Sequence, residues 1–329
     1  MRRALLLTVG RLTRAVCLVH SASRGVGAQQ IQPTARDLQI LFISGAKFSL
    51  NNRSLDAMFS SMYLLTGGGR HSVALVTDDG VVLVDTKGPG WGPALREKIR
   101  LVSDLPVTMI INTTPIGGGA NGDFPDVVDI VAHENTKARL AGMDAFSGQN
   151  ARFLPNKVFK EQLSLPLETA GARDGTNRVD VYYFGPGPSD GDTVVVFPSW
   201  GVAYLGDLFP DKAVPAIETS SGGSPVSLPE TLAKALARLR KEGIDILIPG
   251  RAQPPSTKGV GRWFSLKDLQ EYTDFNQDFL ESVRTSFRAG KSVDNAMAAL
   301  SVLSDKYKQY GMEQAKASIE AIYKELEKR

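Results

Sequence analysis

The sequence contains very little cysteine and histidine. Its 329 residues include one cysteine, Cys17, and three histidines, His20, His71 and His133. Because Cys17 lies in a segment of leader-like composition, 1–28, the chain beyond it has no cysteine for a disulfide, a thiolate nucleophile or a metal ligand. A lone histidine in a protein is most often packed and hydrogen-bonded, so we expect structural or surface roles for His71 and His133.

Long apolar runs and clusters of basic residues are also missing. No stretch beyond the N-terminal segment approaches 18 uninterrupted apolar residues, so we expect no membrane span. Five arginines and no acidic residue lie in 1–28, so the formal net charge of +3 becomes −2 without that segment. A near-neutral chain with no basic stripe has no electrostatic basis for binding nucleic acid or an anionic membrane.

The first 28 residues have the features of a targeting segment. Arg2 and Arg3 precede an apolar run over 4–9, and small residues over 25–28 offer a cleavage site. This pattern favours export to the periplasm or the extracellular space. The Arg-rich, acid-free composition also suits a mitochondrial transit peptide, which is the alternative.

The rest of the sequence contains two successive β-rich halves. Apolar alternation and turn residues predict the strands, and Asp78, Asp79 and Gly80 have the composition of a tight hairpin turn. In the first half the expected strands are 39–43, 72–77, 81–84, 107–111 and 127–132, and the expected helices are 93–102 and 134–140. In the second half the expected strands are 178–184, 193–197, 202–205 and 244–248, with an amphipathic helix over 228–241.

Residues 265–329 have a helical pattern. Ser265 and Asp268 form a capping box at its start, and apolar residues recur at three- and four-residue spacing over 266–287. We expect this apolar face to pack against the β-rich part. Docking of a partner through these helices is the alternative.

Several segments follow one another in a distinctive order. An apolar strand ending in Asp85 is followed by a helix and by an apolar strand ending in Asn112. The further segments of this pattern are 66–92, 128–140, 179–198 and 203–209. The order resembles that of the metallo-β-lactamase-fold hydrolases. The resemblance implies an α/β (α+β) fold, a four-layer αβ/βα sandwich over 29–264, with the C-terminal helical extension 265–329 packed on it.

Most ligand positions of that family's zinc site hold residues that cannot bind zinc. The family carries His-x-His-x-Asp-His in the turn after Asn-Thr, and later loops add His, Asp and His; together they hold two zinc ions that activate water. By resemblance, the corresponding positions here are Thr114, Ile116, Gly118 and Gly119, followed by Pro188, Asp207 and Arg251. Only Asp207, at the place of the family's bridging carboxylate, is a metal ligand by type. We therefore expect no cofactor, although the family as a whole implies zinc.

These positions, together with Asp192, make up the predicted ligand pocket. Asp192 matches the family's Gly-Asp, and Asp85 is expected to support the 112–119 loop. A buried unpaired carboxylate is costly, so we hypothesise that Arg251 enters from the opposite loop and pairs with Asp207. The alternative is that Arg251 points to solvent and backbone amides cap Asp207.

Two further features of the site allow alternatives. The glycines 117–119 form either a concavity of backbone N–H groups that holds an anion or a shortened loop without ligands. In one hypothesis Asp123 joins Asp190 and Asp207 in an oxygen-only site for Mg²⁺ or Ca²⁺. In the other, Asp190 is a solvated turn residue.

These observations favour a non-catalytic member of the family. Such a pseudoenzyme keeps the pocket without the dinuclear zinc site and binds a small molecule or a partner protein. The alternative is a hydrolase that acts through a rebuilt site around Asp207 and Arg251. A third hypothesis is a structural or oligomerisation role of the C-terminal helices. Neither the ligand nor the oligomeric state follows from the sequence, because one fold serves many functions.

Overall fold

The computed structural model describes residues 33–43, 62–167, 177–251 and 263–328, all within the unit Gln32–Arg329. The predicted targeting segment 1–28 lies outside the described residues. Within these four ranges, no helix has the length and apolar character that a membrane crossing requires.

The first sheet has seven strands that follow the order of the chain. They are β1 (Gln39–Phe42), β2 (Met62–Thr66), β3 (Ser72–Thr77), β4 (Gly80–Val84), β5 (Val107–Asn112), β6 (Asp129–His133) and β7 (Lys157–Phe159). Strands β1 to β4 pair antiparallel, with the predicted hairpin turn between β3 and β4. Strands β4 to β7 pair parallel. Parallel neighbours need crossover connections, and here α2 (Gly92–Ile99) joins β4 to β5 and α3 (Glu134–Ala141) joins β6 to β7.

The second sheet has five strands in the order β12-β11-β10-β9-β8. They are β8 (Gln162–Pro166), β9 (Arg178–Tyr182), β10 (Val194–Phe197), β11 (Val202–Gly206) and β12 (Ile246–Pro249). Strands β8 to β11 pair antiparallel. Strands β11 and β12 pair parallel, and the helix α4 (Leu228–Lys241) connects them.

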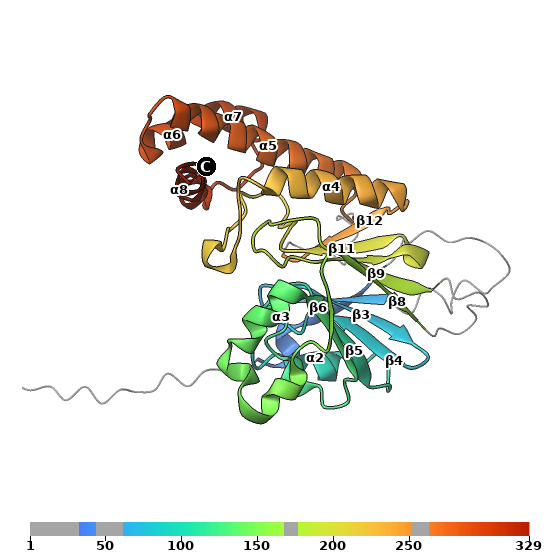
Figure 1. Ribbon diagram of the computed structural model, residues 1–329. Coiled ribbons are helices and arrows are strands. Elements are labelled where there is room, and N and C mark those ends of the chain that lie inside the picture. The colour runs from blue at the N-terminus through green and yellow to red at the C-terminus, as the bar shows by residue number, and fades with distance from the viewer. Residues whose placement is uncertain (1–32, 44–61, 168–176, 252–262, 329) are drawn as a thin grey trace, which may run out of the picture. The chain divides into compact units, whose positions relative to one another are not determined.

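The two sheets face each other across an apolar core, to which Val84 of the first sheet and Val195 of the second both belong. Leu95 of α2 packs in a second cluster on the other face of the first sheet. Leu232 of α4 packs in a third cluster on the other face of the second sheet, together with Phe275 of the long helix α5 (Leu266–Arg288). The order helix, sheet, sheet, helix is the four-layer αβ/βα sandwich that the resemblance implied (Figure 1).

The stretch 263–328 contains four helices, α5, α6 (Val293–Ala299), α7 (Ser301–Lys306) and α8 (Ala315–Leu326). Helix α5 begins after Ser265, whose side chain forms the predicted capping box with Asp268. Its apolar face packs along α4 in the third core cluster, in agreement with the expectation that these helices cover the β-rich part. An oligomerisation role for them stays a prediction.

Candidate functional site

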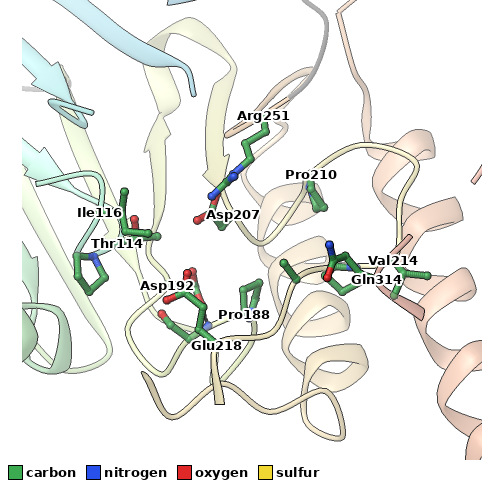
Figure 2. A pocket seen from close by; sticks show the side chains of 14 residues that line it. Thr114, Ile116, Pro188, Asp192, Asp207, Pro210, Val214, Glu218, Arg251 and Gln314 are labelled. Carbon is green, nitrogen blue, oxygen red and sulfur yellow. Dashed lines mark hydrogen bonds and ion pairs between the residues drawn. The ribbon is translucent and has the colours of Figure 1, made fainter. Parts of the chain in front are cut away.

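A cavity of about 180 Å³ lies beyond the carboxyl ends of β5, β11 and β12. The residues expected from the sequence that line it are Thr114, Ile116, Pro188, Asp192, Asp207 and Arg251. The opposite wall comes from the loop after β11, with Pro210, Val214 and Glu218, and from Gln314 just before α8 (Figure 2). The C-terminal extension therefore contributes directly to the cavity.

Two arginines hold Asp207. Arg70 contacts both carboxylate oxygens, because its Nη1 donates to Oδ1 at 2.9 Å and its Nη2 lies 2.8 Å from Oδ2. Arg251 donates from Nε to Oδ1 at 3.2 Å. The side chains of Arg70 and Asp207 are 10% and 14% exposed, whereas that of Arg251 is 50% exposed. The hypothesised pair of Arg251 with Asp207 is present, but the closer and more buried contact comes from Arg70.

Arg70 is a residue of the candidate site that the sequence patterns did not indicate. It follows the glycine run 67–69, whose three residues all have positive φ and turn the chain between β2 and β3. A basic residue after a glycine turn is too common to attract notice in a sequence. The place of Arg70 in the site depends on the fold, which brings Asp207, 137 residues later in the chain, into contact with it.

A buried lysine supports the segment that carries Arg70. Lys87 is 1% exposed, and its Nζ donates to the backbone carbonyls of Leu65 at 3.3 Å, of Gly67 at 3.1 Å and of Arg70. Burial lowers the pKa of Lys87 to about 7, while the charge of Asp85 opposes that shift. Lys87 thus ties the turn before β3 to the segment that follows β4.

Asp85 connects the strands beneath the cavity. Its Oδ1 accepts the backbone N–H of Thr113 at 2.8 Å, and its Oδ2 accepts the hydroxyls of Thr113 at 2.6 Å and of Tyr204 at 3.1 Å. Burial raises the pKa of Asp85 to about 6, although the hydrogen bonds from Thr113 oppose that change. Asp85 therefore supports the start of the 112–119 loop, the position expected for it from the sequence.

Asp192 is a second buried carboxyl group at the cavity. It is 1% exposed, and its Oδ2 accepts the backbone N–H of Ser189 at 2.5 Å. Its Oδ1 has no hydrogen-bond partner in the described part of the chain. Burial, and next the charge of Asp207, raise the pKa of Asp192 to about 8. At pH 7 this group is therefore mostly a neutral carboxylic acid, which can donate a hydrogen bond.

The backbone amides of the glycine loop after β5 are all engaged. The N–H groups of residues 117–119 donate in turn to Thr114 Oγ1, to the carbonyl of Pro115 and to the carbonyl of Ile116, at 3.1 to 3.2 Å. These bonds stay within the loop. Of the two alternatives from the sequence, the arrangement matches the shortened loop rather than a cradle of free N–H groups for an anion.

Gly118 and Gly119 point their Cα hydrogens into packed surroundings. A Cβ on Gly118 would lie 2.9 Å from Asn112 Oδ1, and a Cβ on Gly119 would lie 2.8 Å from Pro89 Cδ. Both distances are shorter than ordinary carbon contacts. Neither glycine is among the residues that line the cavity, contrary to the expectation from the sequence.

The hypothesised oxygen-only metal site does not form. Asp190 pairs instead with Arg139, whose Nε and Nη2 lie 3.2 and 2.8 Å from its carboxylate oxygens, and its side chain, at a bend of the chain, is 26% exposed. The side chain of Asp123 packs beside Gly92. Across the ranges that the structure describes, no group of three His, Cys, Asp or Glu side chains is placed to hold a metal ion.

The two histidines in the described ranges are buried. The ring of His133 stacks on Tyr183 with 4.0 Å between centroids, and its nitrogens contact the carbonyl of Lys160 at 3.0 Å and the N–H of Asn135 at 3.3 Å. The backbone N–H of His71 donates to the carbonyl of Gly250 at 2.9 Å. These contacts agree with the structural roles expected for both residues.

Solved structures similar to this chain have the metallo-β-lactamase fold. A double mutant of the sec-alkyl sulfatase PisA1 has a TM-score of 0.63 at 14% identity, over 81% of this chain and 49% of the sulfatase chain. The metallo-beta-lactamase from Pontibacter korlensis and the metallo-beta-lactamase IND-7 each have a TM-score of 0.50 at 19% identity, over 73% of this chain and 99% of theirs. The chain thus spans about half the length of the sulfatase. No protein-family model and no curated protein sequence matches it. The chain has the metallo-β-lactamase fold, and at these identities the likeness extends to the fold alone.

Proposed function

We propose that this protein is a non-catalytic, metal-independent member of the metallo-β-lactamase fold that binds a small ligand in the cavity beside Asp207. The observation that carries the proposal is the ion pairing of Asp207. Asp207 stands at the position of the family's bridging ligand. Arg70 contacts both of its carboxylate oxygens, and Arg251 donates a hydrogen bond to one of them. A guanidinium is well suited to this planar pairing, and it supplies the positive charge that a buried carboxylate needs.

The residues present do not fit a zinc ion. Zinc sites use at least three protein ligands with nitrogen, sulfur or carboxylate oxygen donors. By resemblance, the ligand positions around the cavity hold Thr114, Ile116, Pro188 and Arg251, and only Asp207 has a suitable donor. The guanidinium of Arg70 lies on that same donor, and its charge repels a second cation.

The packing of the glycine loop also supports the proposal. Histidine or aspartate side chains at positions 118 and 119 would have to displace Asn112 or Pro89, as the short Cβ distances require. Restoring the family's ligand residues one by one therefore would not restore a metal site.

Metal analysis of the full chain tests the proposal. The protein is produced in zinc-supplemented medium, purified without chelator, and its zinc per chain is measured by elemental mass spectrometry. We expect less than roughly a tenth of an equivalent, because intact zinc sites bind too tightly to be emptied by purification. One or two equivalents would overturn the proposal. An Arg70→Ala variant analysed in parallel shows whether removal of the guanidinium alone allows metal to bind.

A hydrolase with a rebuilt site is the second candidate, and the raised pKa of Asp192 favours it. A carboxyl group with a pKa near 8 in a cavity has the protonation state of a general acid at neutral pH. If the protein is such a hydrolase, it hydrolyses an activated ester slowly, and the rate depends on Asp192. Equal rates for the wild-type protein and an Asp192→Asn variant would remove it.

A further inference from the structure

Positive charge exceeds negative charge on the Asp207 side of the cavity. Two guanidinium groups, those of Arg70 and Arg251, meet a single carboxylate there, that of Asp207. The other ionised carboxylate among the described lining residues, that of Glu218, comes from the loop on the opposite wall. A partly buried excess charge attracts a ligand of the opposite sign.

Among the residues that the structure describes, two hydrogen-bond donors at the cavity have no partner. Arg251 uses Nε for Asp207, and within the described ranges no residue accepts a hydrogen bond from its two terminal nitrogens. Asp192, with its Oδ1 unpartnered, lies on the other side of Asp207 from Arg251 (Figure 2). Its raised pKa keeps it protonated at neutral pH. One charged donor and one neutral donor together suit an acceptor group that carries negative charge.

The walls of the cavity are largely apolar. Pro115 and Ile116 come from the loop after β5, and Pro210, Val214 and Pro215 come from the loop after β11. A volume of about 180 Å³ holds only a few carbon atoms beside a polar head group. The ligand that fits such walls has a short apolar body.

We propose that the cavity binds a small organic oxyanion with a short apolar tail, held at its charged end by the terminal N–H groups of Arg251 and the carboxyl group of Asp192. The inference rests on the proposed function, because it takes the cavity to be free of metal. A carboxylate, a sulfate ester and a phosphate ester share this chemistry, and binding measurements separate them.

Glu218 is the group at the cavity that opposes an oxyanion. Its side chain is exposed to solvent, where salt and water screen its charge. The charge of Glu218 therefore has opposite effects on the binding of an anion and of a cation. Neutralising Glu218 tightens the binding of an oxyanion, whereas it weakens the binding of a cation or of a zwitterion that uses Glu218 as its acceptor.

The test is isothermal titration calorimetry of the full chain at low ionic strength. The ligands are butyrate, butyl sulfate and butyl phosphate, with butylammonium and butanol as the cationic and neutral counterparts of equal tail length. We expect measurable binding of at least one of the three anions and none of butylammonium or butanol. The anion that binds most tightly identifies the head group.

Three variants and one control locate the site. Arg251→Gln weakens the best anion at least about tenfold, because a hydrogen bond to a charged group is lost. Asp192→Ala also weakens the best anion, because the carboxyl O–H is lost as a donor. Glu218→Gln tightens binding about two- to fivefold, as expected for an exposed charge. Arg139→Gln is the matched control: Arg139 also pairs with an aspartate but does not line this cavity, so affinity stays within about twofold.

The outcomes separate this inference from the proposed function. Absence of anion binding in folded, metal-free protein overturns the inference and leaves the proposed function standing. Tighter binding of butylammonium than of butyrate, or weaker anion binding by Glu218→Gln, also overturns it. Stoichiometric zinc in the same preparation overturns the proposed function itself. The inference is supported by anion binding that falls with Arg251→Gln and rises with Glu218→Gln.

Discussion

The family's ligand positions lie in two sets of loops, and the two sets differ in this protein. The loop after β5 has no charged side chain over 113–119, and its glycines pack against Asn112 and Pro89. The loops around β10, β11 and β12 contain Asp192, Asp207 and Arg251 at the cavity. One set of loops is closed by packing, and the other stays polar and open to a ligand. Under the proposed function, the charged side chains of the second set take the place of a metal beside Asp207.

The largest expected effect on the polar set of loops is the pH dependence that Asp192 gives to the stability of the protein. Its pKa in the folded protein is raised to about 8 from an ordinary value of 3.8. Between these values the folded state holds a proton that the unfolded state has released, so the contribution of Asp192 to the stability of the wild-type protein falls as pH rises from about 4 to about 8. An Asp192→Asn variant lacks this contribution. We expect the unfolding free energy of the variant, relative to that of the wild-type protein, to rise with pH by up to roughly 1.4 kcal/mol per pH unit between these values.

Urea unfolding of both proteins at several pH values from 5 to 9 measures this difference. The contribution of Lys87, whose lowered pKa acts with the opposite sign above pH 7, is common to both proteins and cancels. A difference in unfolding free energy that is constant with pH would show that Asp192 is ionised in the folded state. The polar side of the cavity would then contain one more negative charge.

The second effect concerns Asp207. Replacement by alanine leaves the guanidinium of Arg70, which is 10% exposed, without its partner. We expect a loss of roughly 3–5 kcal/mol in the free energy of unfolding, as for other buried pairs broken on one side. Asp190→Ala is the matched control, since it breaks the more exposed pair with Arg139 and is expected to cost at most about 1 kcal/mol. Equal losses from the two substitutions would argue that Arg70 and Asp207 form an ordinary surface pair.

The third effect concerns the packing of the glycine loop after β5. Gly118→Ala places a Cβ 2.9 Å from Asn112 Oδ1 and 3.1 Å from Leu140 Cδ2, so we expect a loss of about 1–3 kcal/mol in unfolding free energy. Gly88→Ala is the matched control, because a Cβ there meets no atom within 4 Å. The two variants are compared by urea unfolding. If Gly118→Ala is no less stable than the control, the loop is not closed by packing.

The smallest effect concerns Arg251. Its side chain is 50% exposed, and its contact with Asp207 is the longer of the two guanidinium contacts. An Arg251→Ala variant is therefore expected to lose less than about 1 kcal/mol in unfolding free energy. Thermal and urea unfolding measure this loss. A loss as large as that of Asp207→Ala would mean that Arg251 stabilises the fold rather than serving the cavity.

Local patterns in the sequence predicted most of the regular elements. The helix expected over 228–241 is α4, and the strand expected over 72–77 is β3, with the same bounds. Both have a clear periodicity and clear ends, which are local properties of the chain. The short strands β2, β7 and β8 were not predicted. They have few residues, and β8 ends in a proline, so pairing with neighbours rather than their own pattern defines them.

The candidate site was predictable only where a residue occupies a recognisable position. Asp207 after β11 and Arg251 after β12 follow from the order of segments that resembles the fold family. The sequence by itself therefore determined the fold and the residues at the ligand positions. Arg70 and Lys87 were decided by the tertiary structure alone. An ion pair between residues 137 positions apart, and a lysine that meets three backbone carbonyls, depend on how distant segments pack, and neither leaves a local pattern in the chain.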